Sequence, residues 1–139
     1  MKVFEKHVEY GNPILEKSFR FSVRIVKFYL LRIKNEFHLK DILKQLLRCG
    51  TLSGANVTES QEASSKKDFI NKFSIELKEA RECKYWLKLL KGTEVVNEKE
   101  FLSLINDCDE LIRLLIAIIK RCKHLILNPQ FSILNYHEA

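Results

Sequence analysis

Apolar residues recur at helical spacing in four segments of the chain. In the first segment, alternating steps of four and three residues connect Leu15, Phe19, Ser22, Val26, Tyr29 and Ile33. This stripe is widened by Ile14, Phe21, Ile25 and Phe28. The spacing predicts an amphipathic helix over about 13–35 that buries the face carrying these residues. Pro13 suits the first position of this helix, where an amide hydrogen would have no partner.

A second apolar stripe consists of Leu39, Ile42, Leu43, Leu46 and Leu47. It predicts a second helix that starts near His38. Its far end is ambiguous, because Gly50 and Gly54 each cost a helix about 1 kcal/mol relative to alanine. One interpretation is a loop over 50–56. The other is a continuous helix over 38–63, in which the two glycines share one side and let another backbone approach closely. We favour the continuous helix.

Two further helices are predicted over 66–92 and 98–127. The third follows Ser65 with Asp68 three residues later, as in a capping box, and Gly92 is its expected C-cap. Its apolar face consists of Phe69, Ile70, Phe73, Leu77, Ala80, Leu87 and Leu90. The fourth follows Asn97, and its apolar face consists of Leu104, Cys108, Leu111, Leu115, Ile118, Cys122 and Leu125. Other apolar residues surround most of this helix, which predicts more than one neighbour.

Four amphipathic helices with short links predict an all-α, antiparallel up-down-up-down four-helix bundle. Only 4 Gly and 2 Pro occur in 139 residues, which leaves little material for turns and argues against an all-β fold. We expect a single domain over 1–127 and a C-terminal tail over 128–139. No run is apolar and long enough to predict a membrane span, and the charged N-terminus does not resemble a signal peptide. A cytoplasmic protein with no membrane partner is therefore expected.

The sequence lacks motifs that mark common catalytic, metal and cofactor sites. The four cysteines, at positions 49, 83, 108 and 122, form no C-x-x-C pair and have no histidine at metal-ligand spacing, so reduced thiols are expected. There is no Glu-x-x-His, His-Glu-x-x-His or phosphate-binding loop. These absences predict a protein that is not an enzyme and that holds no metal and no cofactor. The remote alternative is a ribonuclease of the HEPN class, with His38 as general base and Arg32 stabilising the phosphorane.

Positive charge is concentrated in the first two predicted helices. The formal net charge is +6, and residues 1–48 alone hold 11 Lys and Arg against 5 Asp and Glu. On each helix the cations recur at steps of three or four and therefore share a face: Lys17, Arg20, Arg24 and Lys27 on the first, Lys40, Lys44 and Arg48 on the second. Such stripes are either solvated polar faces or sites for nucleic-acid phosphates, whose binding depends on salt. Trp86 favours a core or subunit-interface position over a base-stacking platform.

Several stretches together resemble one family. These are Asn-Pro-Ile-Leu-Glu-Lys-Ser at 12–18, Gln-Leu-Leu-Arg-Cys-Gly-Thr-Leu-Ser-Gly-Ala-Asn at 45–56, Glu-Ser-Gln-Glu-Ala at 59–63, Ser-Lys-Lys-Asp-Phe at 65–69 and Ala-Arg-Glu-Cys-Lys-Tyr-Trp-Leu at 80–87. They are similar to the four-helix-bundle proteins encoded in intervening sequences of bacterial 23S ribosomal RNA genes, often labelled S23 ribosomal protein. The resemblance runs from about Asn12 to Leu125.

The resemblance implies a left-handed bundle that assembles into a homopentamer, and it supports a helix through 50–56. A related branch comprises the accessory proteins of diversity-generating retroelements, in which a basic pentamer binds nucleic acid and a reverse transcriptase. The resemblance to the family also implies structural or interface roles for Gly50, Gly54, Asn56, Glu59, Asp68 and Trp86. The intervening-sequence members have no established activity.

Two functional hypotheses lead from these observations. In the first, a non-enzymatic homo-oligomer binds nucleic acid, RNA in particular, through a basic face made of Lys17, Arg20, Arg24, Lys27, Lys40, Lys44 and Arg48. In the second, the bundle is an interaction scaffold or adaptor whose basic face docks an acidic protein, for example a reverse transcriptase.

Overall fold

The computed structural model describes residues 13–93 and 97–127. Four α-helices follow one another: α2 (Pro13–Asn35), α3 (Lys40–Ser60), α4 (Lys66–Gly92) and α5 (Glu98–Leu127). A turn of 3-10 helix, η1 (Phe37–Leu39), connects α2 to α3. No strand occurs within these ranges, so the all-α class is confirmed. The predicted tail over 128–139 and the start of the predicted domain lie outside the described residues.

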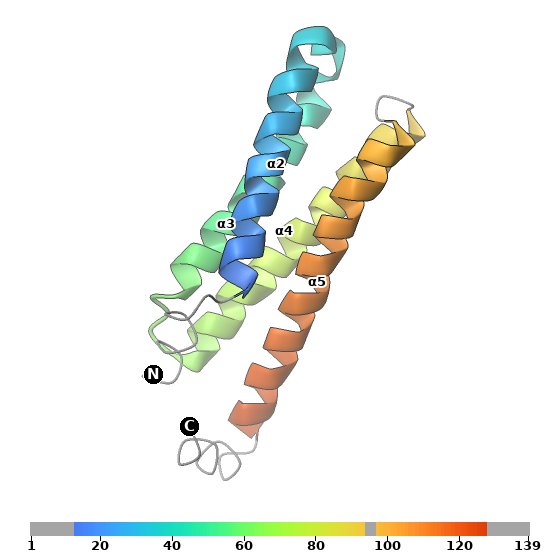
Figure 1. Ribbon diagram of the computed structural model, residues 1–139. Coiled ribbons are helices and arrows are strands. Elements are labelled where there is room, and N and C mark those ends of the chain that lie inside the picture. The colour runs from blue at the N-terminus through green and yellow to red at the C-terminus, as the bar shows by residue number, and fades with distance from the viewer. Residues whose placement is uncertain (1–12, 94–96, 128–139) are drawn as a thin grey trace.

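The four helices pack side by side, and each runs antiparallel to the one before it (Figure 1). Contacts are most extensive between helices that follow each other in sequence, α2 with α3, α3 with α4 and α4 with α5. The α2–α5 contact that closes the bundle is much smaller. The predicted up-down-up-down bundle is therefore present, with one seam looser than the other three.

The buried face of α2 is one side of the broad apolar face that the sequence predicts. The side chains that it buries are Ile14, Ser18, Phe21, Ile25 and Phe28. Phe19, central to the predicted stripe, is instead 72% exposed. Two apolar stripes with helical spacing run along α2, and periodicity alone does not decide between them. The glycines of α3 decide it, because they draw α3 against the side of α2 that carries Ser22 and Ile25.

Helix α3 continues through residues 50–56, so the loop interpretation is wrong. It begins two residues after the predicted start and ends at Ser60 rather than at residue 63. A Cβ placed on Gly50 would lie 2.7 Å from Cγ2 of Ile25, and one on Gly54 would lie 2.6 Å from Oγ of Ser22. The two glycines therefore permit an approach of α2 and α3 that larger residues would prevent.

Polar side chains cap the later helices. Ser65 Oγ accepts a hydrogen bond from the Asp68 amide at 3.0 Å, as predicted. Asp68 does not return the bond to Ser65, as a capping box requires, but accepts from the Ser64 amide at 3.1 Å. That bond is the main cause of the lowered pKa of Asp68. Gly92 is the last residue of α4 rather than its C-cap, a place taken by Thr93 with φ of −91°.

The core contains residues from all four helices, and the four cysteines are free and buried within it. The link from Gln61 to Ser65 adds Ala63 to this core. None of the described helices combines the length and the apolar character that crossing a membrane requires.

Candidate nucleic-acid interface

The predicted basic residues of α2 lie in two different settings. Lys17 pairs with Glu110 of α5, and Arg24 pairs with Asp107 and donates from Nη2 to Ser103 Oγ at 2.8 Å. The Lys17 ammonium lowers the pKa of Glu110 by hydrogen bonding to its carboxylate. These two cations therefore contribute to holding α5 against α2. Lys27 is exposed, with no acidic group within ion-pair distance in the described residues.

Arg20 is the fourth of these cations, and its Nη2 atom lies 2.7 Å from Glu16 Oε1, one turn earlier on the same helix. Both side chains are about two-thirds exposed. No hydrogen bond or ion pair of Arg20 to another helix occurs within the described residues, so Arg20 remains accessible while its charge is locally neutralised.

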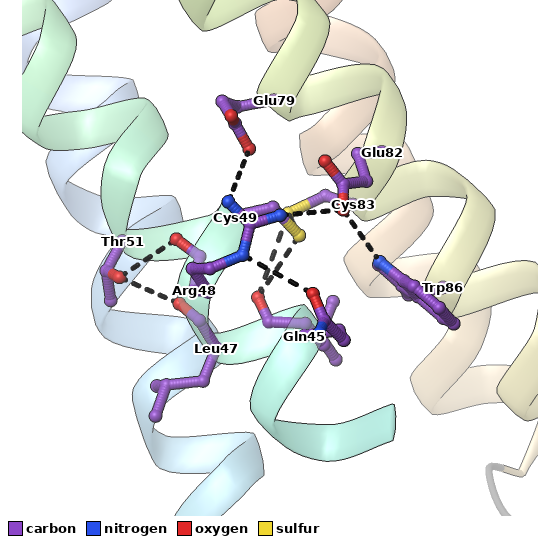
Figure 2. A network of polar contacts seen from close by, with 10 residues as sticks. Gln45, Leu47, Arg48, Cys49, Thr51, Glu79, Glu82, Cys83 and Trp86 are labelled. Atoms are coloured by element: carbon purple, nitrogen blue, oxygen red, sulfur yellow. Dashed lines mark hydrogen bonds and ion pairs between the residues drawn. The ribbon is translucent and has the colours of Figure 1, made fainter. Parts of the chain in front are cut away.

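Arg48 bridges α3 and α4 (Figure 2). Its Nη2 lies 2.8 Å from Glu82 Oε1, its Nη1 lies 3.8 Å from Glu79 Oε2, and its Nε donates to Gln45 Oε1 at 3.3 Å. The negative charge of Glu82 is the main cause of the raised pKa of Arg48. Arg48 therefore serves first as a link between helices, although it is still partly exposed.

Trp86 joins the same network from α4. Its indole Nε1 donates to Glu82 Oε1 at 3.3 Å (Figure 2). Its ring is half-buried against the core, with the more exposed Tyr85 ring 5.1 Å away in an edge-on arrangement. A hydrogen-bonded and packed indole is not free to stack on a base, whereas Tyr85 is 58% exposed.

Lys40 and Lys44 leave more positive charge available than Arg48 does. Lys44 is exposed and lies one turn before Arg48, and Lys40 lies one further turn away. Neither side chain meets an acidic partner within ion-pair distance in the described part of the chain. Lys40 Nζ lies 4.8 Å from the centre of the Phe37 ring, a cation–π contact that keeps the full charge.

A stripe of exposed cations on α4 was missed by the sequence reasoning. Lys78, Arg81 and Lys88 are exposed and, across the described ranges, have no ion-pair partner. Tyr85 lies between Arg81 and Lys88 in this series, and the four residues follow one another at steps of three or four. This spacing places all four on one outward face of α4. The 3-4 spacing of these residues was visible in the sequence. It was overlooked because acidic residues outside α4 offset its charge: residues 49–96 hold 8 Lys and Arg against 7 Asp and Glu, whereas 66–92 alone hold 8 against 4.

Comparison with known proteins identifies the relatives of this chain. The model of the 23S rRNA-intervening sequence protein family matches residues 12–117. The chain belongs to this family. A crystal structure of a protein with unknown function from the S23 ribosomal protein family of Bacteroides thetaiotaomicron VPI-5482 is similar, with 47% sequence identity and a TM-score of 0.74. The similarity covers 77% of this chain and 98% of that one. No curated protein matches.

The positions singled out from the 23S rRNA-intervening sequence family pattern have different structural roles. Gly50 and Gly54 lie at the α2–α3 contact, and Asp68 caps α4. Glu59 is exposed and Asn56 is half-buried on the last turns of α3. Their proposed roles at an interface stay predictions, as does the relationship to the accessory proteins of diversity-generating retroelements.

The described residues hold no cluster of metal ligands, and Arg32 of the ribonuclease alternative is engaged with acidic side chains. No group of three or more His, Cys, Asp or Glu side chains in residues 13–93 and 97–127 is arranged to hold a metal ion. Arg32 pairs with Glu36 and Glu100, and its guanidinium carbon lies 5.4 Å from the centre of the Phe28 ring. His38 lies in η1 and is exposed.

Proposed function

We propose that this protein is a non-enzymatic, self-associating bundle that binds nucleic acid, RNA in particular, through a basic face on α3 and α4. The supporting observation is a set of cations on these two helices that have no ion-pair partner in the described residues, namely Lys40 and Lys44 on α3 and Lys78, Arg81 and Lys88 on α4. Of these, Lys44 and Lys78 lie nearest the seam between α3 and α4. The Arg48–Glu82 ion pair marks this seam. Lys44 lies one turn from Arg48 on α3, and Lys78 lies one turn from Glu82 on α4.

These side chains suit phosphate groups rather than a particular base sequence. Flexible ammonium groups neutralise backbone phosphates and release their counterions, which gives affinity that falls steeply with salt. The exposed Tyr85 ring among them offers one base a stacking surface, which favours a strand whose bases are unpaired. The residues of α2 contribute less to this face, since Lys17 and Arg24 are paired with acidic residues of α5.

Charge reversal tests the location of the face. The variant combines Lys44→Glu with Lys88→Glu, and Lys120→Glu provides a matched control because Lys120 is an exposed cation of α5. Binding of a short single-stranded RNA is measured across a salt series, with DNA of the same sequence in parallel. The double variant is expected to bind more weakly and to lose about 0.7 from the salt slope for each lost contact. Equal binding by the double variant and wild type would contradict the proposal.

Self-association is supported by a second apolar stripe on α2, which we call the α2 outer stripe. It consists of Phe19, Val23, Val26, Leu30 and Ile33 of α2, at alternating steps of four and three residues, and continues to Phe37 of η1. Phe19, Leu30 and Phe37 are 72%, 53% and 64% exposed. Val23, Val26 and Ile33 between them are half-buried. An apolar stripe that is partly open to solvent is typical of an interface between proteins, and this spacing suits a helix packed alongside. Five copies are what the family resemblance implies.

The oligomer is tested by light scattering. Phe19→Glu with Leu30→Glu places two charges in the α2 outer stripe without touching the core, so a folded monomer is expected. Ile75→Glu is the control, because Ile75 is an exposed apolar residue of α4 that lies outside the stripe. A wild-type monomer, or a double variant that keeps the wild-type mass, would remove the proposed interface.

The second candidate function is a protein scaffold, and the α2 outer stripe is the observation that favours it. The stripe offers an apolar surface to a partner of another kind, while the cations of α3 and α4 attract an acidic protein such as a polymerase. Recovery of one defined partner after nuclease treatment, together with no RNA binding at low salt, would replace the first proposal with this one. Any RNA cleavage that is lost in His38→Ala would instead restore the ribonuclease alternative.

A further inference from the structure

Two cysteine thiols from neighbouring helices meet in the core. Cys49 of α3 and Cys83 of α4 are fully buried, and their sulfur atoms lie 3.1 Å apart. The Cys49 thiol is also within hydrogen-bond distance of the Leu46 carbonyl at 3.4 Å. A disulfide bond measures about 2.05 Å, so the two sulfurs need to close by about 1 Å to reach it.

We propose that Cys49 and Cys83 form an oxidisable thiol pair that hydrogen peroxide converts to a disulfide between α3 and α4. One thiolate attacks a peroxide oxygen, the O–O bond breaks, and the sulfur becomes a sulfenic acid. The hydroxide that leaves takes up the proton that the thiol released and forms the first water. The second thiolate then attacks that sulfur and displaces hydroxide, which takes up a proton to form a second water. Two thiols lose two electrons and two protons in total, and one peroxide is reduced to two waters.

The surroundings of the pair make this reaction slow in the closed bundle. The hydrogen bond with Cys49 and, after it, burial raise the pKa of the Cys83 thiol, which keeps the nucleophilic thiolate scarce. Oxidant therefore reaches the pair when α3 and α4 separate locally, a motion that small domains undergo without global unfolding. The rate of oxidation reports how often this seam opens.

The other two thiols lack such a partner among the described residues. Cys108 points its thiol at the Ala80 carbonyl at 3.2 Å, and burial raises its pKa to about 12. Burial also raises the pKa of the Cys122 thiol. Neither has another sulfur within hydrogen-bond distance, so a selective intramolecular product is expected at Cys49 and Cys83.

The bond would lie directly beneath the polar link between the two helices. Cys49 follows Arg48 and Cys83 follows Glu82, the residues whose ion pair spans the surface of this seam (Figure 2). A disulfide here covalently connects α3 to α4 and restricts the unfolded chain. This consequence concerns the seam itself and holds whether or not the seam binds RNA.

The experiment uses the full reduced chain and graded hydrogen peroxide. The expected product has lost two of its four titratable thiols and two hydrogens in mass, yields a linked Cys49–Cys83 peptide, and returns to the starting state with a dithiol reductant. Its melting temperature should exceed that of the reduced protein. Cys108→Ala is the matched control, because it removes a buried thiol and should still give the same linked peptide.

Three outcomes would overturn the proposal. One is the survival of all four thiols at peroxide levels that fully oxidise free cysteine. Another is the gain of oxygen without the loss of hydrogens, and the third is linkage through Cys108, Cys122 or a second chain. Peptide mapping of the wild-type protein decides between these outcomes, so the test does not depend on the folding of a Cys49 variant.

Discussion

Helix α3 is joined to its two neighbours mainly by small and buried groups, with the Arg48–Glu82 ion pair at the surface of the α3–α4 seam, whereas α2 is joined to α5 largely by half-exposed charges. At the α3 seams, Gly50 packs against Ile25, Ser22 Oγ donates to the Gly50 carbonyl at 2.8 Å, and Ser53 faces Glu76 in the core. The α2–α5 seam instead contains the Lys17–Glu110 and Arg24–Asp107 ion pairs.

The two kinds of seam therefore contribute differently to the geometry and to the stability of the bundle. A close contact between small residues tolerates no added volume, because protein interiors are packed as densely as organic crystals. Half-exposed ion pairs are screened by water and salt and contribute little individually. We therefore expect the α3 seams to determine the geometry and stability of the bundle, and the α2–α5 seam to yield first when the bundle is strained. Three predictions test this difference.

The largest effect is expected at Glu76, a fully buried carboxyl at the α3–α4 seam. Burial raises its pKa to about 9, against 4.5 for an ordinary glutamate, because only a weak hydrogen bond from Ser53 at 3.5 Å compensates the charged form. The folded state thus holds a proton that the unfolded state releases, and stability should fall between pH 4.5 and 9. The slope should approach about 1.4 kcal/mol per pH unit.

Glu76→Gln removes this titration. We expect the variant to match wild type near pH 4 and to become progressively more stable than wild type as the pH rises, measured by urea unfolding at several pH values. Glu59→Gln, at an exposed position on the neighbouring helix α3, is the control, and its stability should change with pH as that of wild type does. If the unfolding free energies of wild type and Glu76→Gln change with pH in the same way, the Glu76 carboxyl is not protonated in the folded state.

The next effect is expected at Gly50. In Gly50→Ala the new methyl group would lie 2.7 Å from Cγ2 of Ile25, so one helix must move. Overpacking of this kind costs about 1–3 kcal/mol, more than the gain in helix propensity. Gly92→Ala is the control, because nothing lies within 4 Å of its added Cβ. If urea unfolding finds the two variants equally stable, the close α2–α3 contact is wrong.

The smallest effect is expected at the charged seam. Asp107→Asn removes the ion pair with Arg24 and should cost about 0.2–1 kcal/mol at low salt. The loss should shrink as salt is added, since screening already weakens the pair in wild type. If the loss of unfolding free energy is larger than this range and does not depend on salt, the α2–α5 seam stabilises the bundle as much as the α3 seams do.

The helices were largely predictable, because their signals are local. Ser65 at the start of α4 and Asn97 ahead of α5 accept backbone hydrogen bonds where the sequence suggested, from the amides of Asp68 and Glu100. The continuity of α3 through Gly50 was ambiguous on propensity alone, because burial against α2 outweighs the intrinsic cost of the two glycines. The candidate site was predicted less well, since periodicity places a cation on a face but does not say which acid faces it.

The sequence by itself determined the number, length and direction of the helices and the excess of positive charge, because spacing, caps and composition are properties of short segments. Only the tertiary structure decided which of two apolar stripes on α2 is buried and which cations are neutralised. It also brought Cys49 against Cys83, although 34 positions separate them in the chain. Each of these depends on which helix lies opposite, and the close approach at Gly50 and Gly54 orients α2 against α3.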